Sequence, residues 1–118
     1  MSVVEQNARA HILTDDDIQR QDEGAVPVVL RYDPGADPRS VRVGLPGTRE
    51  CTVPRSLLEE GLRVPAGTGQ VRVWPCGRVQ TVVEFHSPRG VSVVQFETRA
   101  LLRFLRRTYA AATPVVHR

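Results

Sequence analysis

Lysine is absent from this chain of 118 residues, and all sixteen of its basic residues are arginine. Arginine therefore also stands at surface positions where lysine would serve. A single arginine consequently says little about function. Only a group of arginines brought to one surface is informative.

Long hydrophobic runs are also missing. No apolar stretch approaches the roughly 20 residues that a membrane-spanning helix needs. The first seven residues lack the basic start and the long apolar stretch of a secretory signal. We therefore expect a cytoplasmic protein of one domain, because a chain of this length suffices for one modest core.

Cysteine and histidine are scarce, and neither has the spacing of a metal site. Cys51 and Cys76 form no Cys-x-x-Cys motif, while His11, His86 and His117 lie far apart in the chain. The sequence therefore predicts no metal site and no cofactor. We expect both cysteines to be reduced, partly buried thiols; a disulfide is left open and requires that the two side chains meet.

Recognisable catalytic motifs are lacking as well. There is no Gly-x-Ser-x-Gly elbow, and the adjacent Glu59 and Glu60 of an expected helix diverge from one another. The glycine-rich stretch 67–70 leads into an expected strand, whereas phosphate-binding loops lead into a helix. The sequence predicts no catalytic residue and a protein that is not an enzyme. A Ser-His-Asp site assembled in space is left open.

Charge is divided unevenly along the chain. Residues 1–24 hold six acidic residues and two arginines, a net charge of −4, and residues 25–118 hold fourteen arginines and seven acidic residues, a net charge of +7. The net positive charge of residues 25–118 is compatible with nucleic-acid binding and also with a solvated surface. We divide the chain into an acidic N-terminal strand and connection (1–24), a main domain (25–112) and a short tail (113–118).

Alternation of apolar and polar residues, interrupted by Gly and Pro, predicts a chain made mostly of strands. The expected strands are residues 3–13, 26–32, 41–43, 71–74, 79–86 and 91–96. The last two form a hairpin across residues 87–90, whose Ser-Pro-Arg-Gly sequence suits a type I turn. Apolar residues on both faces of 91–96 predict cover on both sides or a bulge. Segment 14–17 is either a short helical turn or part of an acidic loop.

Two helices complete the expected fold. Pro54 suits the first turn of a short helix that continues to Glu60, and Gly61 suits its end. The second helix runs from Thr98 to about Ala112. Its apolar side consists of Leu101, Phe104, Leu105, Thr108 and Tyr109. The fold class is therefore α+β, a mainly antiparallel sheet with two helices.

Four arginines gather on the opposite side of the second helix, and they are the candidate contacts to a partner or to nucleic acid. They are Arg99, Arg103, Arg106 and Arg107. An acidic protein, phosphates or anionic lipid would suit them, and the alternative is the solvent side of an amphipathic helix. Few aromatics accompany them, which disfavours recognition of single strands by base stacking. Trp74, the only Trp, is expected to be a packed core or interface residue.

Five blocks of sequence, in order, resemble the SsgA-like (SALP) sporulation and cell-division proteins of filamentous actinobacteria. The blocks are Leu30-Arg31-Tyr32-Asp33 with Asp37-Pro38 and Val41; residues 55–62; residues 65–75; residues 87–90; and residues 104–108. The motif residues expected to be structural are Arg31, Tyr32, Asp33, Asp37, Pro38, Gly61, Gly67, Gly69, Trp74 and Pro75. Arg31 and Asp33 flank a strand end, and we expect an ion pair between them to hold the following turn; the alternative is direct contact with a partner.

The resemblance implies a small homotrimer with a whirly-like fold. It implies a role in selecting or activating septum sites in sporulation-linked cell division, through the tubulin-like division GTPase, another SsgA-like protein or control of peptidoglycan remodelling. The family is not known for an active site or a cofactor, and the protein would be cytoplasmic and recruited to division septa. The alternative function, suggested by the net positive charge of residues 25–118 and by the arginine-rich helix, is a nucleic-acid-binding module.

Overall fold

Eight strands pair in an antiparallel manner into one sheet, and two helices pack against it. The computed structural model describes residues 3–13, 25–45, 50–88 and 90–112. Its elements are β1 (Val4–Ile12), β2 (Val26–Tyr32), β3 (Ser40–Gly44), β4 (Glu50–Pro54), α1 (Arg55–Gly61), β5 (Ala66–Thr68), β6 (Val71–Cys76), β7 (Gln80–Ser87), β8 (Gly90–Glu97) and α2 (Thr98–Ala112). The strand order is β4-β3-β2-β1-β8-β7-β6-β5. The predicted α+β class, with a mainly antiparallel sheet and two helices, is confirmed.

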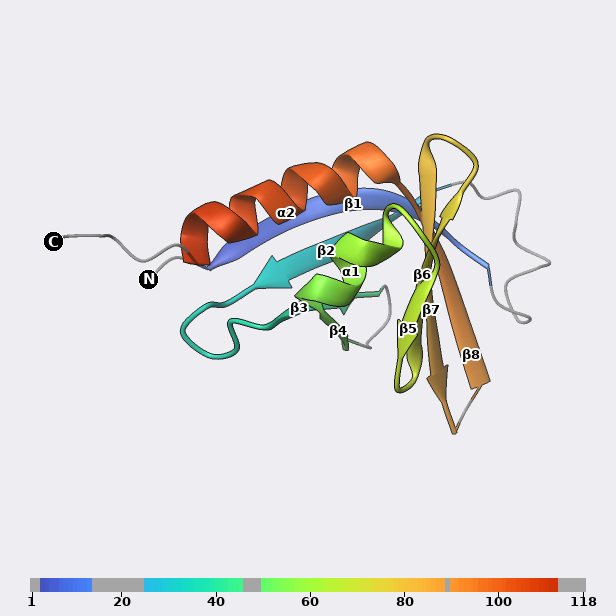
Figure 1. Ribbon diagram of the computed structural model, residues 1–118, viewed down its shortest axis with the longest axis horizontal. Coiled ribbons are helices and arrows are strands. Elements are labelled where there is room, and N and C mark those ends of the chain that lie inside the picture. The colour runs from blue at the N-terminus through green and yellow to red at the C-terminus, as the bar shows by residue number, and fades with distance from the viewer. Residues whose placement is uncertain (1–2, 14–24, 46–49, 89, 113–118) are drawn as a thin grey trace, which may run out of the picture.

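The sheet consists of two halves that meet at a narrow junction. Strands β1 and β2 pair over seven positions, whereas β1 and β8 pair over only three, from Ala10↔Phe96 to Ile12↔Val94. Figure 1 shows β1 and β2 running crosswise to β6, β7 and β8. Both helices contact both halves: α1 contacts β3 and β4 as well as β5 and β6, and α2 contacts β1 as well as β7 and β8. The helices therefore hold the two halves at their angle.

The core fills the space between the two half-sheets and the helices. Its large, fully buried side chains include Leu30 and Tyr32 of β2, Leu58 of α1, and Leu101 and Phe104 of α2. In the other half, three aligned residues of neighbouring strands are also fully buried, namely Val73, Val83 and Val94. Removal of this apolar surface from water supplies the main driving force for folding.

Most predicted elements are present, and two short strands were missed. The hairpin of β7 and β8 closes at residues 87–90, where Ser87 Oγ donates to the carbonyl oxygen of Gly90 over 3.2 Å. The missed strands are β4, which ends in a proline, and β5, which has three residues within a stretch rich in Gly and Pro. Short strands of this composition lack the alternating pattern that predicts a strand. The alternatives for residues 14–17 lie outside the described residues.

The alternative of a bulge in β8 is wrong, and within the single chain the two faces of β8 are covered unequally. Val94 and Phe96 are buried, whereas Val93 on the opposite face is half-buried and Val91 is 43% exposed. The register of β7 with β8 runs without a break from Gln80↔Glu97 to Ser87↔Gly90. The helices lie on the face of Val94 and Phe96. On the other face Val82, paired with Trp74 and Gln95, is buried, while Val91 is exposed, so the single chain covers this face only in part. This face of β6, β7 and β8 is called the outer face below.

The first helix ends at Gly61 as predicted, but Gly61 is not a left-handed cap. It is the last residue of α1 and is buried, and the capping position is Leu62, whose φ of −69° is right-handed. A Cβ at Gly61 would collide with Cγ1 of Val73 and would lie 2.9 Å from the carbonyl oxygen of Val73. Glycine is therefore needed here for close contact of α1 with β6 rather than for a left-handed helix end.

The substitution Gly61→Ala should destabilise the fold by about 1–3 kcal/mol, because overpacking against β6 exceeds the gain of about 1 kcal/mol in helix propensity. The measurement is the free energy of unfolding from urea denaturation. Gly44→Ala is the matched control, since its Cβ would have ordinary contacts, the nearest at 3.5 Å from the carbonyl oxygen of Val29. Equal stability of Gly61→Ala and the unchanged protein would contradict this role.

Candidate partner-binding surface

The motif residues between β2 and β3 shape one turn. The Tyr32 hydroxyl donates a hydrogen bond to the carbonyl oxygen of Pro38 over 2.9 Å. Asp33 Oδ1 accepts hydrogen bonds from the backbone N–H groups of residues 35 and 36, and Asp37 Oδ1 accepts one from the N–H of Arg39. Aspartate side chains in such positions accept hydrogen bonds from backbone N–H groups that have no backbone partner in the turn.

The expected ion pair between Arg31 and Asp33 is wrong. Arg31 Nη1 lies 3.6 Å from Oε2 of Glu5, its directly paired neighbour on β1. Successive side chains of a strand point to opposite faces, and residues paired across two strands share a face. Glu5 is therefore within reach of Arg31, while the Asp33 carboxylate is engaged by the turn.

Arg55 joins the start of α1 to the end of α2. Its guanidinium lies 4.1 Å from the ring centre of Tyr109 and 5.2 Å from that of Tyr32. Its Nη1 donates to the Tyr32 hydroxyl over 3.3 Å and is 3.5 Å from the carbonyl oxygen of Thr108. Burial, together with the hydrogen bond that the Tyr109 hydroxyl donates to Glu59, raises the pKa of the Tyr109 phenol above its usual value. The local sequence gives Arg55 no role beyond its motif.

The glycines and Trp74 of the block 65–75 lie around the hairpin of β5 and β6. Gly69 has a φ of +58°, so it supplies the left-handed residue of the turn. Gly67 lies opposite Arg72, Trp74 pairs with Val82, and Pro75 pairs with Thr81. Gly67, Arg72 and Trp74 line a hollow of about 520 Å³. Trp74 is half-buried on the outer face rather than in the core, which leaves its predicted role at an interface open.

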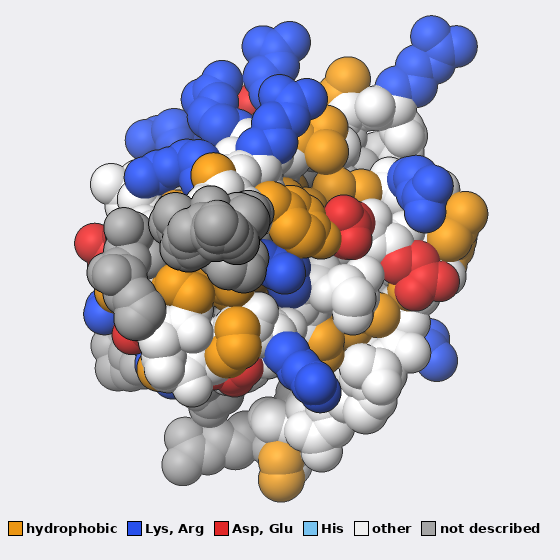
Figure 2. Space-filling model, turned by 60° about the vertical axis from the view of Figure 1, so that its left-hand side comes forward, with side chains coloured by type: hydrophobic (Ala, Val, Ile, Leu, Met, Phe, Trp, Pro, Cys, Tyr) orange, Lys and Arg blue, Asp and Glu red, His pale blue; other side chains and the backbone are white. Residues whose placement is uncertain are grey.

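Of the four arginines of α2, one is hydrogen-bonded to β1 and three are exposed without such a bond among the described residues. Arg107 lies toward β1, where its Nη1 donates to the carbonyl oxygen of Glu5 and to Oε1 of Gln6, each over 3.2 Å. Arg99, Arg103 and Arg106 are exposed and make no hydrogen bond or ion pair with the described residues. Figure 2 shows basic side chains gathered along the upper edge of the molecule, where α2 runs. The structure therefore brings three of the four predicted contact residues to one free surface.

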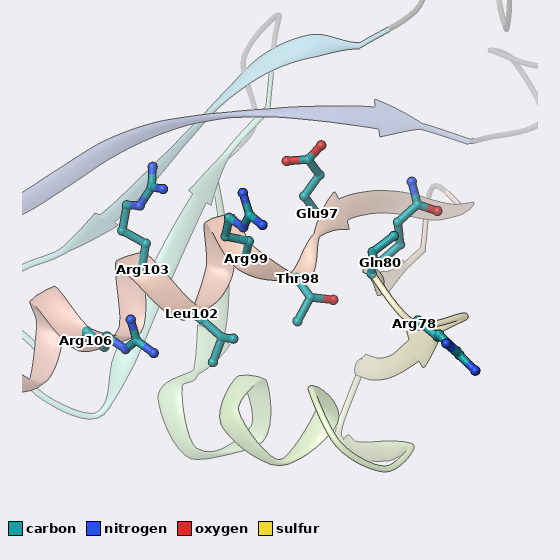
Figure 3. Close-up of a pocket in the computed structure, with 9 residues that line it drawn as sticks. Arg78, Gln80, Glu97, Thr98, Arg99, Leu102, Arg103 and Arg106 are labelled. Atoms are coloured by element: carbon teal, nitrogen blue, oxygen red, sulfur yellow. The ribbon is translucent and has the colours of Figure 1, made fainter.

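These three arginines line a groove of about 870 Å³ beside the start of α2, called the arginine groove below. The turn between β6 and β7 adds Arg78 and Val79, and α2 adds Leu102. Glu97 is the one acidic residue among the described residues that line it. Figure 3 shows Arg99 and Arg103 pointing to the same side as Glu97, while Leu102 points toward α1. The groove thus combines four positive charges with exposed apolar side chains.

Hydrogen bonds at the first residue of α2 position the groove. The backbone N–H of Thr98 donates to the carbonyl oxygen of Val79 over 2.8 Å, and the hydroxyls of Thr98 and Thr81 are 2.7 Å apart. Thr98 follows β8 directly, so α2 starts with no intervening loop. Arg78 and Arg99, distant in sequence, therefore line the same groove on a rigid frame.

Cysteine and histidine side chains are dispersed in the described chain. Cys51 is half-buried on β4, as predicted, but the prediction of a partly buried thiol is wrong for Cys76, which is exposed at the end of β6. The structure does not join the two in a disulfide. His86 Nε2 lies 3.0 Å from Oε1 of Glu84. Among the described residues, no three His, Cys, Asp or Glu side chains gather as metal ligands. Neither described helix is long and apolar enough to cross a membrane.

A family model described as "Streptomyces sporulation and cell division protein, SsgA" matches residues 26–115. The chain belongs to the SsgA family. A relative from Streptomyces coelicolor, named sporulation-specific cell division protein SsgB, is 44% identical over 96 residues, which are 75% of this chain and 69% of the relative. An SsgB from Frankia casuarinae is 39% identical over 94 residues, 73% of this chain and 64% of the relative. The chain thus spans about two thirds of the length of these SsgA-family relatives.

Solved structures of the same family share the fold. One, titled for mutations in SsgB that correlate to longitudinal cell division during sporulation of Streptomyces coelicolor, is 37% identical with a TM-score of 0.75. The match covers 93% of this chain and 86% of that one. A second, an SsgA-like sporulation-specific cell division protein from Thermobifida fusca, is 26% identical with a TM-score of 0.72, over 93% of this chain and 82% of that one.

Most of the residues that line the arginine groove were not predicted from the sequence. Val79 was predicted only as the start of a strand, and neither Arg78 nor Leu102 was singled out. A helical projection could have found Leu102, because Leu102 and Arg106 are four residues apart on one side of α2. The position of Arg78 beside these residues depends on the hydrogen bonds of Thr98 to Val79 and Thr81, which the linear sequence does not reveal.

Replacing Arg55 by Ala should lower the free energy of unfolding by about 1–3 kcal/mol, because both ring contacts and the hydrogen bond to Tyr32 are lost. Arg63→Ala is the matched control: Arg63 is exposed beyond α1, its side chain makes no contact given for the described residues, and its loss should change stability by less than about 0.5 kcal/mol. Urea denaturation of both variants is the measurement. Equal losses would show that Arg55 does not connect the helices.

Proposed function

We propose that this chain is a non-enzymatic regulator of septum-site selection or activation in sporulation-linked cell division. The observation that carries the proposal is the family match over residues 26–115, with relatives named sporulation-specific cell division proteins. The protein acts through protein–protein contacts, with the tubulin-like division GTPase or another SsgA-like protein as partner. It works in the cytoplasm at division septa.

The same proposal includes a homotrimer with a whirly-like arrangement of the sheets. The outer face supports it, because Trp74 and Val93 are half-buried there and Val91 is 43% exposed. A neighbouring copy would remove this apolar surface from water. Three copies would present each partner surface three times, which strengthens binding to a polymeric target.

Nucleic-acid binding is the second candidate function. Four arginines at one groove and the net charge of +7 over residues 25–118 favour it. Such binding would weaken steeply with added salt, because bound counterions are released from the phosphates.

The mass in solution tests the trimer. Light scattering on a size-exclusion column should give about three times the 13.1 kDa of the chain. Val93→Arg, on the outer face, should shift the mass toward the monomer, because an interfacial charge is left without a partner. Val64→Arg is the matched control, since Val64 is 50% exposed in the segment after α1 and should leave the trimer intact. A monomeric unchanged chain would contradict the assembly.

Deletion of the gene in its sporulating host tests the function. We expect sporulating hyphae of the deletion strain to form fewer septa or misplaced ones, and a fluorescent fusion of the protein to collect at septa. Restoring the unchanged gene should restore septation. Normal septum number and position in the deletion strain would overturn the proposed role.

A further inference from the structure

The arginine groove holds four guanidinium groups that the described chain leaves without a counterion. Arg78, Arg99, Arg103 and Arg106 have no ion pair or side-chain hydrogen bond among the described residues. Other arginines of the same chain are held: Arg31 and Arg42 pair with carboxylates, and Arg55 and Arg107 bond to oxygens of neighbouring elements. Arg39, Arg63 and Arg72 also have no side-chain partner among the described residues, but they lie on three different parts of the chain, whereas the groove gathers four such arginines on one surface.

Their spacing along α2 raises the electrostatic free energy of the chain. Arg99 and Arg103 are four residues apart and Arg103 and Arg106 are three apart, so these like charges are neighbours on one helix face. Glu97 is the one carboxylate that lines the groove among the described residues. An anionic ligand would relieve this repulsion, and guanidinium groups suit carboxylates because they can donate two parallel hydrogen bonds.

Apolar side chains in the same groove distinguish between anionic ligands. Val79 is 68% exposed and Leu102 is 40% exposed, and both are among the residues that line the groove. A nucleic-acid backbone offers no apolar group to cover them, and the described lining includes no aromatic ring on which a base would stack. An acidic peptide with an apolar side chain matches both features.

The volume of the groove limits the ligand to a short segment. About 870 Å³ lies within the range of roughly 300–1,000 Å³ that is typical of ligand clefts. A concave site of this size suits a narrow chain better than a flat membrane surface. The frame is rigid, since Thr98 is bonded to both Val79 and Thr81.

We propose that the arginine groove binds a short acidic segment of a partner protein, whose carboxylates are bound by arginines of the groove and whose apolar side chain packs on Val79 and Leu102. The inference rests on the proposed function as a regulator acting through protein contacts, and it names the surface and the chemistry of the partner. Exposed ion pairs are screened by salt, so binding to one groove is weak and salt-dependent.

The probe is a short fluorescein-labelled peptide in which Asp and Glu residues flank one Leu, and binding is followed by fluorescence anisotropy. We expect saturable binding at low salt that weakens as NaCl is added. The peptide with Asn and Gln in place of the acidic residues should not bind, and the peptide with Ser in place of Leu should bind several-fold more weakly.

Paired variants locate the site. Arg99→Ala with Arg103→Ala should weaken peptide binding by about tenfold or more. Arg39→Ala with Arg63→Ala is the matched control, because it removes the same charge from exposed positions outside the groove. Leu102→Ser should also weaken binding, whereas Val64→Ser, at an exposed valine elsewhere, should not.

Four outcomes would overturn the proposal. They are absence of peptide binding at low salt, equal loss in the two arginine pairs, tighter binding of a single-stranded oligonucleotide through the same arginines, and tighter binding of phosphatidylglycerol vesicles through them. Septation in the host separates this inference from the proposed function. If deletion of the gene disturbs septation but the Arg99→Ala, Arg103→Ala protein fully restores it, the groove proposal fails and the proposed function stands. If deletion has no effect on septation, the proposed function itself fails, whatever the peptide binds.

Discussion

Packing of α2 into the angle between two half-sheets is the constraint on which the rest of the structure depends. The halves share only three paired positions of β1 and β8, too few to set an angle between them. Leu101, Phe104 and Leu105 of α2 are almost completely buried in that angle, together with core residues from both halves. Because interiors are packed as tightly as crystals, a shift of the helix would disturb both halves at once. The position of α2 in turn determines where its exposed arginines lie.

The arginines of this chain serve two physically different purposes. Arg55 and Arg107 donate to oxygens and, for Arg55, stack on aromatic rings, so they connect elements that lie far apart in sequence. Arg99 and Arg103 make no such contact with the described residues and face solvent at the groove. A planar guanidinium suits both purposes, since it can stack and can also bind carboxylates. Residue type alone therefore does not separate structural arginines from binding ones, and the contacts do.

Local patterns were sufficient to predict most of the fold. The β-branched residues of 26–32, the alternation in residues 71–74, the turn residues at 87–90 and the helical period of 98–112 each depend on neighbours in sequence, and the strands, the hairpin and the helix that they predict are present. Strand β4 and strand β5 were missed because each is short and holds proline or glycine, so only pairing with β3 or β6 makes it a strand. The local sequence indicates only a helix end at Gly61. It does not reveal the close contact of Gly61 with Val73, because Val73 belongs to another element.

The sequence by itself determined the fold class, the family and the arginine-rich face of the last helix, because periodicity and ordered motifs are properties of the linear chain. Only the tertiary structure decided that Arg107 is bound to β1, that Arg31 pairs with Glu5, and that Arg78 lines the same groove as Arg99. These are contacts between residues far apart in the chain. They depend on strand register and on the hydrogen bonds of Thr98, which form only when the whole core is assembled.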